Sequence, residues 1–231
     1  MRKFIVLLIL AVLGYFMFDI FSGLHLGEPH FVNGVKDFYL SKTVSDLHVA
    51  NTITSIVVNF RGFDTLGEVT VLFLAVSAMG SVLYKKRHEA GTRTVLFASS
   101  NIVRSGSKLL FPAIMLLGAY VFIHGHLSPG GGFQGGTIIA TGFLLMLLAY
   151  RDFKVSHHIL SYVESFAGII FVVVGLFGFM GGGTFLQNFM PAGELNELFS
   201  GGVIGIIYVM VGFKVAAELT GLIYTILHEK D

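Results

Sequence analysis

The feature that most constrains the fold of this sequence is a series of apolar segments, each about as long as a membrane is thick. A helix needs roughly 20 apolar residues to cross the hydrocarbon core of a bilayer. When the polar residues at their ends are counted, six segments approach or exceed that length: residues 4–21, 65–84, 107–124, 134–150, 158–180 and 201–227. We therefore predict an all-α, polytopic transmembrane protein of about six spans in the cell membrane. For the first segment, the alternative is a cleaved signal peptide.

The composition supports a membrane protein and excludes several function classes. Hydrophobic residues make up 54% of the chain and charged residues 13%, whereas soluble domains carry about 25% charged residues. The net charge of +1 gives no broad attraction to nucleic acid. Because the chain has no cysteine, it offers no thiolate to an iron–sulfur cluster. No cofactor motif is recognisable either. We expect no bound cofactor, no resident metal, and no redox or hydrolytic site in this chain.

The distribution of basic residues predicts the orientation in the membrane. With the spans placed as above, 11 of the 15 Lys and Arg residues fall on one side, three fall on the other, and Lys214 lies inside the last span. Loops rich in Lys and Arg stay in the cytoplasm. We therefore predict that both termini and the basic segment 85–107 are cytoplasmic. The long segment before the second span contains residues 43–60, which we interpret as an amphipathic helix on the membrane surface or on a partner.

Ionisable residues within the spans are the most informative chemical signal. Lys214 and Glu218 are four residues apart in the last span, so they share a helix face and can pair. A charge in the middle of a membrane costs about 3 kcal/mol on insertion scales, so such residues face other helices or a water-filled path. Two interpretations stay open: a part in ion or proton transfer, and a buried pair that locks this span to a neighbour.

Three further carboxylates lie near the ends of predicted spans, where their position does not by itself distinguish a functional role from a structural one. Glu164 is a turn or so inside the predicted cytoplasmic end of the fifth span, where it could also extend to the interface. Asp64 and Glu68 share a face at the start of the second span. The helix dipole favours a carboxylate at that end, which explains Asp64 better than the deeper Glu68. All three are candidates for ion transfer, with these structural explanations beside them.

A glycine-rich segment joins the third and fourth predicted spans. It reads HGHLSPGGGFQGG over His124–Gly136, with five glycines between Ser128 and Gly136. It is no phosphate-binding loop, because no Lys-Ser or Lys-Thr follows the glycines. We expect it to form a tight or re-entrant connection that packs against another subunit. Histidine titrates near neutral pH, so His124 and His126 are candidates for a proton relay, although histidines at span ends are usually just solvated.

Two motifs resemble those of a known family. The segment His124–Gly136, followed by GFKVAAE over Gly212–Glu218, resembles the MnhB component of Mrp-type, or Mnh-type, sodium/proton antiporters across about residues 95–228. The motif FRGFDTLGE over Phe60–Glu68 is similar to one near the C-terminal end of MnhA, the large component of these antiporters. The same module exists as a separate small protein in membrane-bound hydrogenases and sulfur-reducing complexes.

The resemblance implies a division of the chain and a role for one residue. Residues 1–90 would form a two-span module like the C-terminal end of MnhA, and residues 91–231 a four-span MnhB-like module. In that family the glutamate of the GE motif, here Glu68, is implicated in ion transfer. The chain departs from the usual arrangement because it joins both modules and lacks the many-span, antiporter-like portion of MnhA.

These observations predict an accessory membrane subunit of a multisubunit sodium/proton antiporter or a related energy-converting respiratory complex. Expected partners are other antiporter-type membrane subunits in a hetero-oligomer, with hydrogenase or sulfur-reductase modules as further candidates, together with the lipid bilayer. Sodium ions and protons are the expected transported ions. The alternatives are a structural scaffold with no direct part in ion transfer and an independent small transporter or channel. The sequence leaves open which kind of complex the chain serves.

Overall fold

The structure, a computed structural model, describes residues 2–23, 34–87, 99–150, 152–181 and 183–228. Every regular element within these residues is a helix, which confirms the predicted all-α class. The chain divides into two compact units, Met1–Phe38 and Tyr39–Asp231. The predicted boundary between the two modules, at residues 90 and 91, lies outside the described residues, as does part of the predicted cytoplasmic segment 85–107.

The first unit contains helix α1 (Arg2–Gly23) and the beginning of α2 (Val35–Ser45). Helix α1 covers the first predicted span, residues 4–21. Its described apolar stretch, Val6–Ser22, is shorter than those of the other predicted spans. A membrane crossing by α1 therefore stays a prediction.

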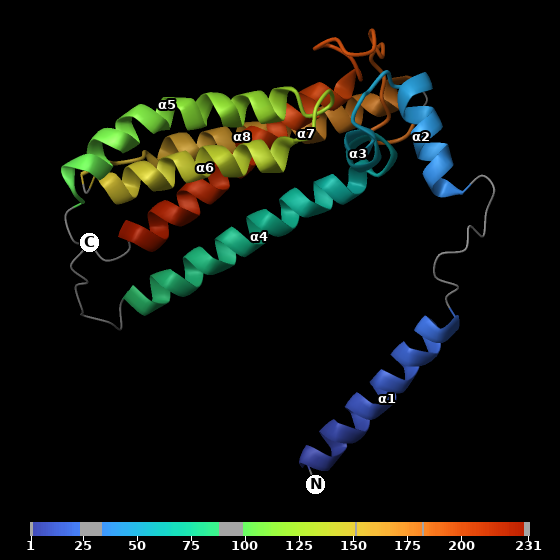
Figure 1. The fold of residues 1–231 in the computed structure, drawn as a ribbon, viewed down its shortest axis with the longest axis horizontal. Coiled ribbons are helices and arrows are strands. Elements are labelled where there is room, and N and C mark those ends of the chain that lie inside the picture. Colours follow the sequence, from blue (N-terminus) through green and yellow to red (C-terminus); the bar gives the residue numbers. More distant parts are fainter. Residues whose placement is uncertain (1, 24–33, 88–98, 151, 182, 229–231) are drawn as a thin grey trace. The chain divides into compact units, whose positions relative to one another are not determined.

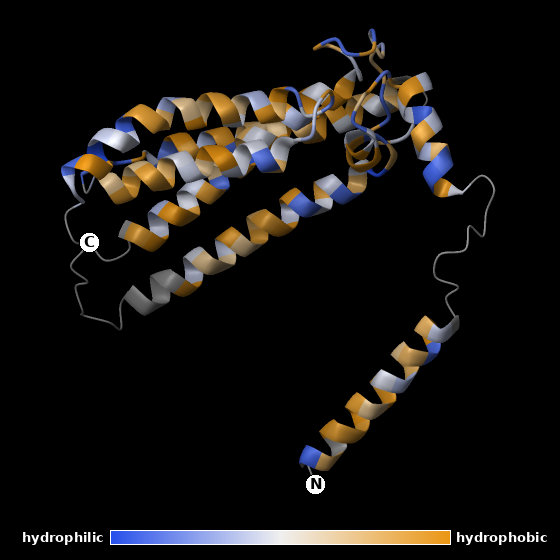
Figure 2. Ribbon diagram, in the orientation of Figure 1, coloured by the Kyte–Doolittle hydropathy of each residue, from blue (hydrophilic) through white to orange (hydrophobic). Residues whose placement is uncertain are grey.

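The second unit includes, among the described residues, five helices that are long and apolar enough to cross a membrane. They correspond to the second to sixth predicted spans, and Figure 2 shows apolar residues along most of their described length. The chain is therefore a multi-pass membrane protein. The side on which each terminus lies stays a prediction. The helices are α4 (Gly62–Arg87), α5 (Asn101–Ile123), α6 (Gly132–Ala149), α7 (His157–Phe177) and α8 (Val203–His228).

Helix α8 is the element around which the bundle packs. Helices α6 and α7 pack closely against it, α4 contacts it less extensively, and α5 packs on α6 (Figure 1). The buried face of α8 repeats every three to four residues, as expected for a helix with one face in the core. That face meets Val69 of α4 and Phe171 of α7 in one apolar cluster. Its α8 members are Val203, Ile204, Ile207, Tyr208, Val211 and Val215.

Glycines allow α5, α6 and α8 to approach each other closely. A Cβ atom on Gly135 of α6 would lie 2.6 Å from the carbonyl oxygen of Gly118 on α5. A Cβ atom on Gly136 would lie 2.7 Å from the carbonyl oxygen of Gly212 on α8. Small residues of this kind are typical of membrane helix interfaces. These contacts lie within the chain, and the predicted packing of the glycine-rich segment against another subunit stays a prediction.

The segment before α4 differs from the single amphipathic helix predicted over residues 43–60. It comprises the end of α2, the short helix α3 (Thr52–Ser55) and a π-helical turn (Ile56–Phe60). Val49 and Val58 are buried in the same cluster as the α8 side chains. Of the apolar residues that indicated a surface helix, Leu47 and Val58 pack into the chain's own bundle, where burial removes them from water. Val44 and Ile53 stay exposed.

Candidate functional site

Three ionisable side chains meet where α7 packs on α8. Nζ of Lys214 donates a hydrogen bond to Oε1 of Glu218 at 2.6 Å, which is the pair predicted from their spacing. The same ammonium group lies 3.8 Å from Oε1 of Glu164 on α7. Lys214 and Glu218 lie in the middle of the 26-residue helix α8. The structure therefore joins three candidates from two spans into one cluster, which we call the α7–α8 charge cluster.

Burial differs sharply among the three members. The side chain of Glu218 is 0% exposed, compared with 14% for Lys214 and 23% for Glu164. The second carboxylate oxygen of Glu218, Oε2, has no hydrogen-bond partner in the described part of the chain. The ammonium group of Lys214 also lies 5.3 Å from the ring centre of Phe73 on α4, a cation–π distance. A buried carboxylate with an unsatisfied oxygen is costly, so this arrangement requires an explanation beyond stability.

A cavity of about 310 Å³ adjoins the cluster, between α4, α7 and α8. Such a volume is large enough to hold several water molecules. Its polar lining consists of side chains from all three helices: Ser77, His157, Ser161, Glu164, Ser165, Glu218 and Thr225. The three serines and Thr225 were missed by the sequence analysis. Ser161 and Ser165 flank Glu164 at helical spacing, and this pattern was the available signal.

A second cavity, of about 490 Å³, touches the cluster from the other direction. Glu164 and Lys214 line it, together with Thr70 and Ser165. The rest of its lining is apolar and comes from the second half of α7 and the first half of α4: Leu66, Val69, Phe73, Gly168, Ile169, Phe171, Val172 and Val173. Polar lining therefore continues from the cluster toward the beginning of α7, and apolar lining continues toward its end.

The motif that contains Glu68 and Asp64 begins helix α4. Asp64 forms an exposed ion pair with Arg61 at 2.5 Å, and Thr65 donates a hydrogen bond to the carbonyl oxygen of Val57 at 2.6 Å. These contacts fix the turn between the π-helical segment and α4. Glu68 is exposed on α4 and does not line the cavities of the charge cluster.

The two candidate histidines lie at the end of the bundle where α5 stops. His124 stacks on Tyr120, with ring centres 4.3 Å apart. His126 is 1% exposed, and neither of its ring nitrogens has a hydrogen bond of normal geometry among the described residues. Burial lowers the pKa of His126, against the opposing effect of the nearby backbone at Glu197 and Leu198. Neither histidine belongs to the charge cluster.

Around His126 the loop is held by hydrogen bonds that the sequence did not predict. The hydroxyl of Tyr208 donates to Thr54 at 3.1 Å, and Thr54 donates to the carbonyl oxygen of Gly125 at 2.6 Å. The Asn51 amide donates to the carbonyl oxygens of Gly125 and Ser128 at 2.9 and 3.0 Å. These bonds join α3, the glycine-rich loop and α8, so this end of the second unit is rigidly connected.

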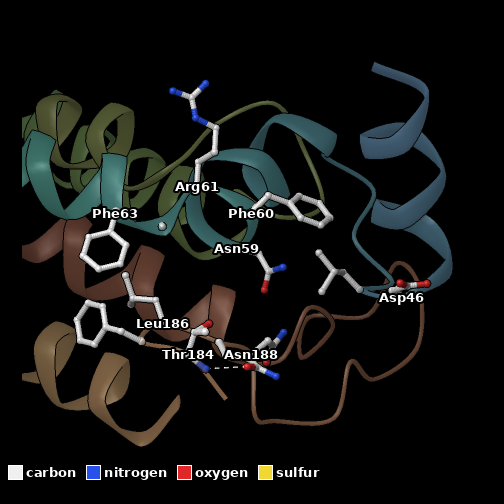
Figure 3. Close-up of a pocket in the computed structure, with 12 residues that line it drawn as sticks. Asp46, Asn59, Phe60, Arg61, Phe63, Thr184, Leu186 and Asn188 are labelled. Carbon is white, nitrogen blue, oxygen red and sulfur yellow. Dashed lines mark hydrogen bonds between the residues drawn. The ribbon is translucent and has the colours of Figure 1, made fainter. Parts of the chain in front are cut away.

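A separate cavity of about 480 Å³ opens between the start of α4 and the segment before α8 (Figure 3). Asn59, Phe60 and Arg61 line one wall, and Thr184–Asn188 line the other. Figure 3 shows Asn59 directed between these walls and Arg61 directed away from them. In the described residues, no group of three or more His, Asp or Glu side chains is arranged to hold a metal ion. Asp46 and Arg61 are the charged residues in the lining of this cavity, and Arg61 pairs with Asp64 outside it.

Fold and site together define a multi-pass helical membrane protein with ion-paired side chains inside its spans. The chain belongs to the family described as "Domain related to MnhB subunit of Na+/H+ antiporter", whose sequence model matches residues 102–221. The preceding part, residues 2–96, matches the model of the MbhE family, a component of MBH. Both matches agree with the resemblance drawn from the motifs.

Individual relatives come from two kinds of complex. A chain of the membrane-bound sulfane sulfur reductase, an archaeal respiratory membrane complex, is 40% identical, with a TM-score of 0.80 and 98% of both chains covered. The MnhB-type component of the Na(+)/H(+) antiporter of Bacillus subtilis (strain 168) is 36% identical over 91 residues, which cover 38% of this chain and 63% of that protein. A chain of the Mrp complex from Dietzia sp. DQ12-45-1b shares the fold, with a TM-score of 0.73 at 24% identity. That match covers 96% of this chain and 25% of the Dietzia chain.

Proposed function

We propose that this chain is an accessory membrane subunit of a multisubunit cation/proton antiporter or a related energy-converting respiratory complex. The family match and the two kinds of relatives support this assignment. Its partners are other membrane subunits in a hetero-oligomer, and sodium ions and protons are the transported ions. We further propose that it works as a transport-complex component with no redox or hydrolytic site of its own, and that residues 1–90 and 91–231 act as two modules.

The proposed contribution of the chain is a section of the ion-transfer path. The observation that carries this proposal is Glu218, a carboxylate with no exposed surface, one unpartnered oxygen and a neighbouring cavity. A purely structural subunit could avoid these costs, because replacing a buried ion pair with well-packed apolar residues is often neutral or stabilising. Glu218 can hold a proton or a cation, and Lys214 and Glu164 provide neighbouring charges that balance each occupied state.

Glu68 is proposed as a second station of the path. It is exposed on α4 within this chain, so a partner subunit or water must complete its surroundings inside the membrane. In the described residues no ion pair joins it to the charge cluster. His124 and His126 are the remaining relay candidates. The burial of His126 without ring partners fits a group that is kept neutral.

The test uses Glu218→Gln and Glu68→Gln in the assembled complex, because Gln keeps the size of Glu and removes its charge. We expect both variants to assemble and to transport poorly in inverted membrane vesicles, measured as sodium-dependent proton movement. Full transport by both would favour the structural scaffold. Affinity purification through a tag on this chain identifies the complex, since co-purified antiporter subunits or respiratory enzyme subunits distinguish the two kinds.

A further inference from the structure

Two cavities adjoin at Glu164 and Ser165: a polar end between α4, α7 and α8 that Glu218 lines, and an apolar end along the second half of α7. This asymmetry suggests a direction of access. On α7 four of the five lining residues of the polar end are polar, at helical spacing: His157, Ser161, Glu164 and Ser165. On α8 Glu218 and Thr225 are the polar lining residues, two turns apart, with Gly221 and Leu222 between them. The beginning of α7 and the end of α8 lie at the same end of the bundle (Figure 1). Polar side chains therefore lead from that end to the middle of α8.

Beyond the charge cluster the packing is apolar. Val211 and Val215 of α8 are at most 1% exposed, and they pack with Val69 and Phe171 in the main core cluster. The adjoining cavity has Ile169, Val172 and Val173 of α7 in its lining, where the polar end has serines. Water has few polar partners in such surroundings, and a buried water needs two to four of them. The core thus forms a barrier between the cluster and the end of the bundle where α8 begins.

The charges of the cluster indicate what the polar cavity would carry. Glu164 and Glu218 are two carboxylates against the single ammonium of Lys214, so one negative charge is left over when all three are ionised. One monovalent positive charge, a proton or an alkali cation, restores neutrality. A divalent cation would leave a net positive charge in a low-dielectric region, which is unfavourable. Oε2 of Glu218 is the unpartnered atom for such a cation. Because the Glu218 side chain has no exposed surface in this structure, neighbouring side chains must move before a cation in the cavity can reach it.

We propose that the cavity between α4, α7 and α8 is an aqueous access channel, open toward the α6–α7 loop only, through which Glu218 exchanges a monovalent cation. The proposal rests on the ion-transfer function proposed above and adds a route and a side to it. The apolar core seals the channel toward the beginning of α8. Movement of the cation beyond Glu218 then requires a change at Lys214, which pairs with Glu218 and lines the second cavity, whereas Glu164 lines both.

Cysteine accessibility tests this proposal directly, because the chain has no cysteine of its own. Ser161→Cys and Thr225→Cys line the cavity from two different helices, and Tyr162→Cys is the matched control beside Ser161 that does not line it. Lys154→Cys, exposed in the α6–α7 loop, marks the side of entry. Each variant is made in the complete complex, in right-side-out and inverted vesicles. The probe is a membrane-impermeant, cationic methanethiosulfonate, with labelling followed on this chain.

We expect the cysteines at 161 and 225 to react from the side on which the cysteine at 154 reacts, at least about tenfold faster than the cysteine at 162, because a thiol in hydrocarbon ionises poorly. Glu218→Gln should reduce the preference for cationic over anionic reagents. Slowing by sodium but not by choline would identify an alkali cation as the occupant. If sodium does not slow the labelling and the cysteines still react, the monovalent cation that Glu218 exchanges is a proton carried by water.

Two results would overturn the inference: reaction at 161 and 225 from the opposite side, or equally slow reaction at 161, 162 and 225. Because the cavity cysteines lie on α7 and α8, misassembly of one variant, seen on a native gel, leaves the other as the deciding measurement. The labelling needs no transport activity. If Glu218→Gln abolishes transport while the cavity stays inaccessible, the proposed function stands and the access channel is rejected.

Discussion

The α7–α8 charge cluster and the outward face of α4 each carry a glutamate inside a membrane span, but their surroundings are opposite. Glu218 has no exposed surface and receives a hydrogen bond from Lys214 at 2.6 Å. Glu68 is exposed, and the described residues give it no ion pair. One carboxylate is surrounded by its own chain, whereas the other lies where lipid or a partner subunit must be.

The difference shows how the cost of an intramembrane charge can be met in two ways. At the charge cluster the chain itself supplies a counter-charge, hydroxyl groups and a cavity. On α4 the chain places Glu68 within the span but provides no counter-charge for it. The groups that offset the cost of this charge must therefore come from the assembled complex. We therefore expect substitutions at the cluster to change the stability of this chain, and substitutions at Glu68 to change transport with little effect on stability.

The largest expected effect is that of Lys214→Met. It leaves Glu218 buried without its counter-charge, and breaking one partner of a buried pair costs about 3–5 kcal/mol. We expect a markedly lower melting temperature of the purified complex, or loss of this chain from it on a native gel. The double variant Lys214→Met/Glu218→Gln removes both charges and should recover most of the stability without recovering transport. Recovery of transport as well would mean that the pair is only a structural tie.

A smaller effect is expected when the packing of α8 is disturbed without touching its charges. A Cβ atom on Gly136 would lie 2.7 Å from the Gly212 carbonyl oxygen and 2.8 Å from Cβ of Val215. Gly136→Ala must push α6 away from α8, and overpacking of this kind costs about 1–3 kcal/mol. The control is Gly205→Ala on α8, where no atom lies within 4 Å of the added Cβ. Equal thermal stability of the two variants would contradict the close packing described here.

The third effect concerns pH and the loop end of the bundle. Burial lowers the pKa of His126, so the folded chain binds this proton less readily than the unfolded chain does. Stability is then fully present above the unfolded pKa of about 6.5, and it falls as pH drops below that value, by at most about 1.4 kcal/mol per pH unit. His126→Leu should reduce this loss of stability at acid pH. Melting curves recorded between about pH 7.5 and about pH 5.5, roughly one unit on either side of the unfolded pKa, measure it.

His124→Gln is the matched control for the pH experiment, because His124 is only half-buried and stacks on Tyr120 in the same loop. It should keep the acid-dependent loss of stability seen in the unaltered complex. If His124→Gln removes that loss and His126→Leu retains it, the assignment of the pH dependence to the buried ring is wrong.

The sequence predicted more about the α7–α8 charge cluster than about the surroundings of the other sites. Hydropathy located five spans that the structure confirms, and the four-residue spacing of Lys214 and Glu218 predicted their pairing. It could not predict that Glu164 joins them, because the 3.8 Å approach to Lys214 depends on how α7 crosses α8. The cavity depends on the same packing. Its serines were overlooked because a single hydroxyl on a span is too common to indicate a site.

The loop end was predicted least well, for a related reason. The residues around Val49 and Val58 have the pattern of a surface helix. Their burial against α8 depends on tertiary packing, which the local sequence pattern does not predict. The glycine-rich segment was recognised as a site of close approach, but its contacts within the chain were not predicted, and its packing against another subunit stays a prediction. Spacing shows that a glycine admits a neighbour, whereas only the fold shows that the neighbour of Gly136 is Gly212 of the same chain.

The smallest expected effect on stability is that of Glu68→Gln, and it is the sharpest test of the comparison. Glu68 is exposed, and substitutions at such positions usually change stability by no more than about 0.5 kcal/mol. The melting temperature of the complex should therefore stay close to that of the unaltered complex while transport falls. Asp64→Asn is the matched control one turn earlier. Its exposed pair with Arg61 is worth about 0–1 kcal/mol, and its loss should leave transport largely intact. If Glu68→Gln instead releases this chain from the complex, Glu68 is a docking residue, and the cluster around Glu218 becomes the only ion-transfer station supported by these carboxylates.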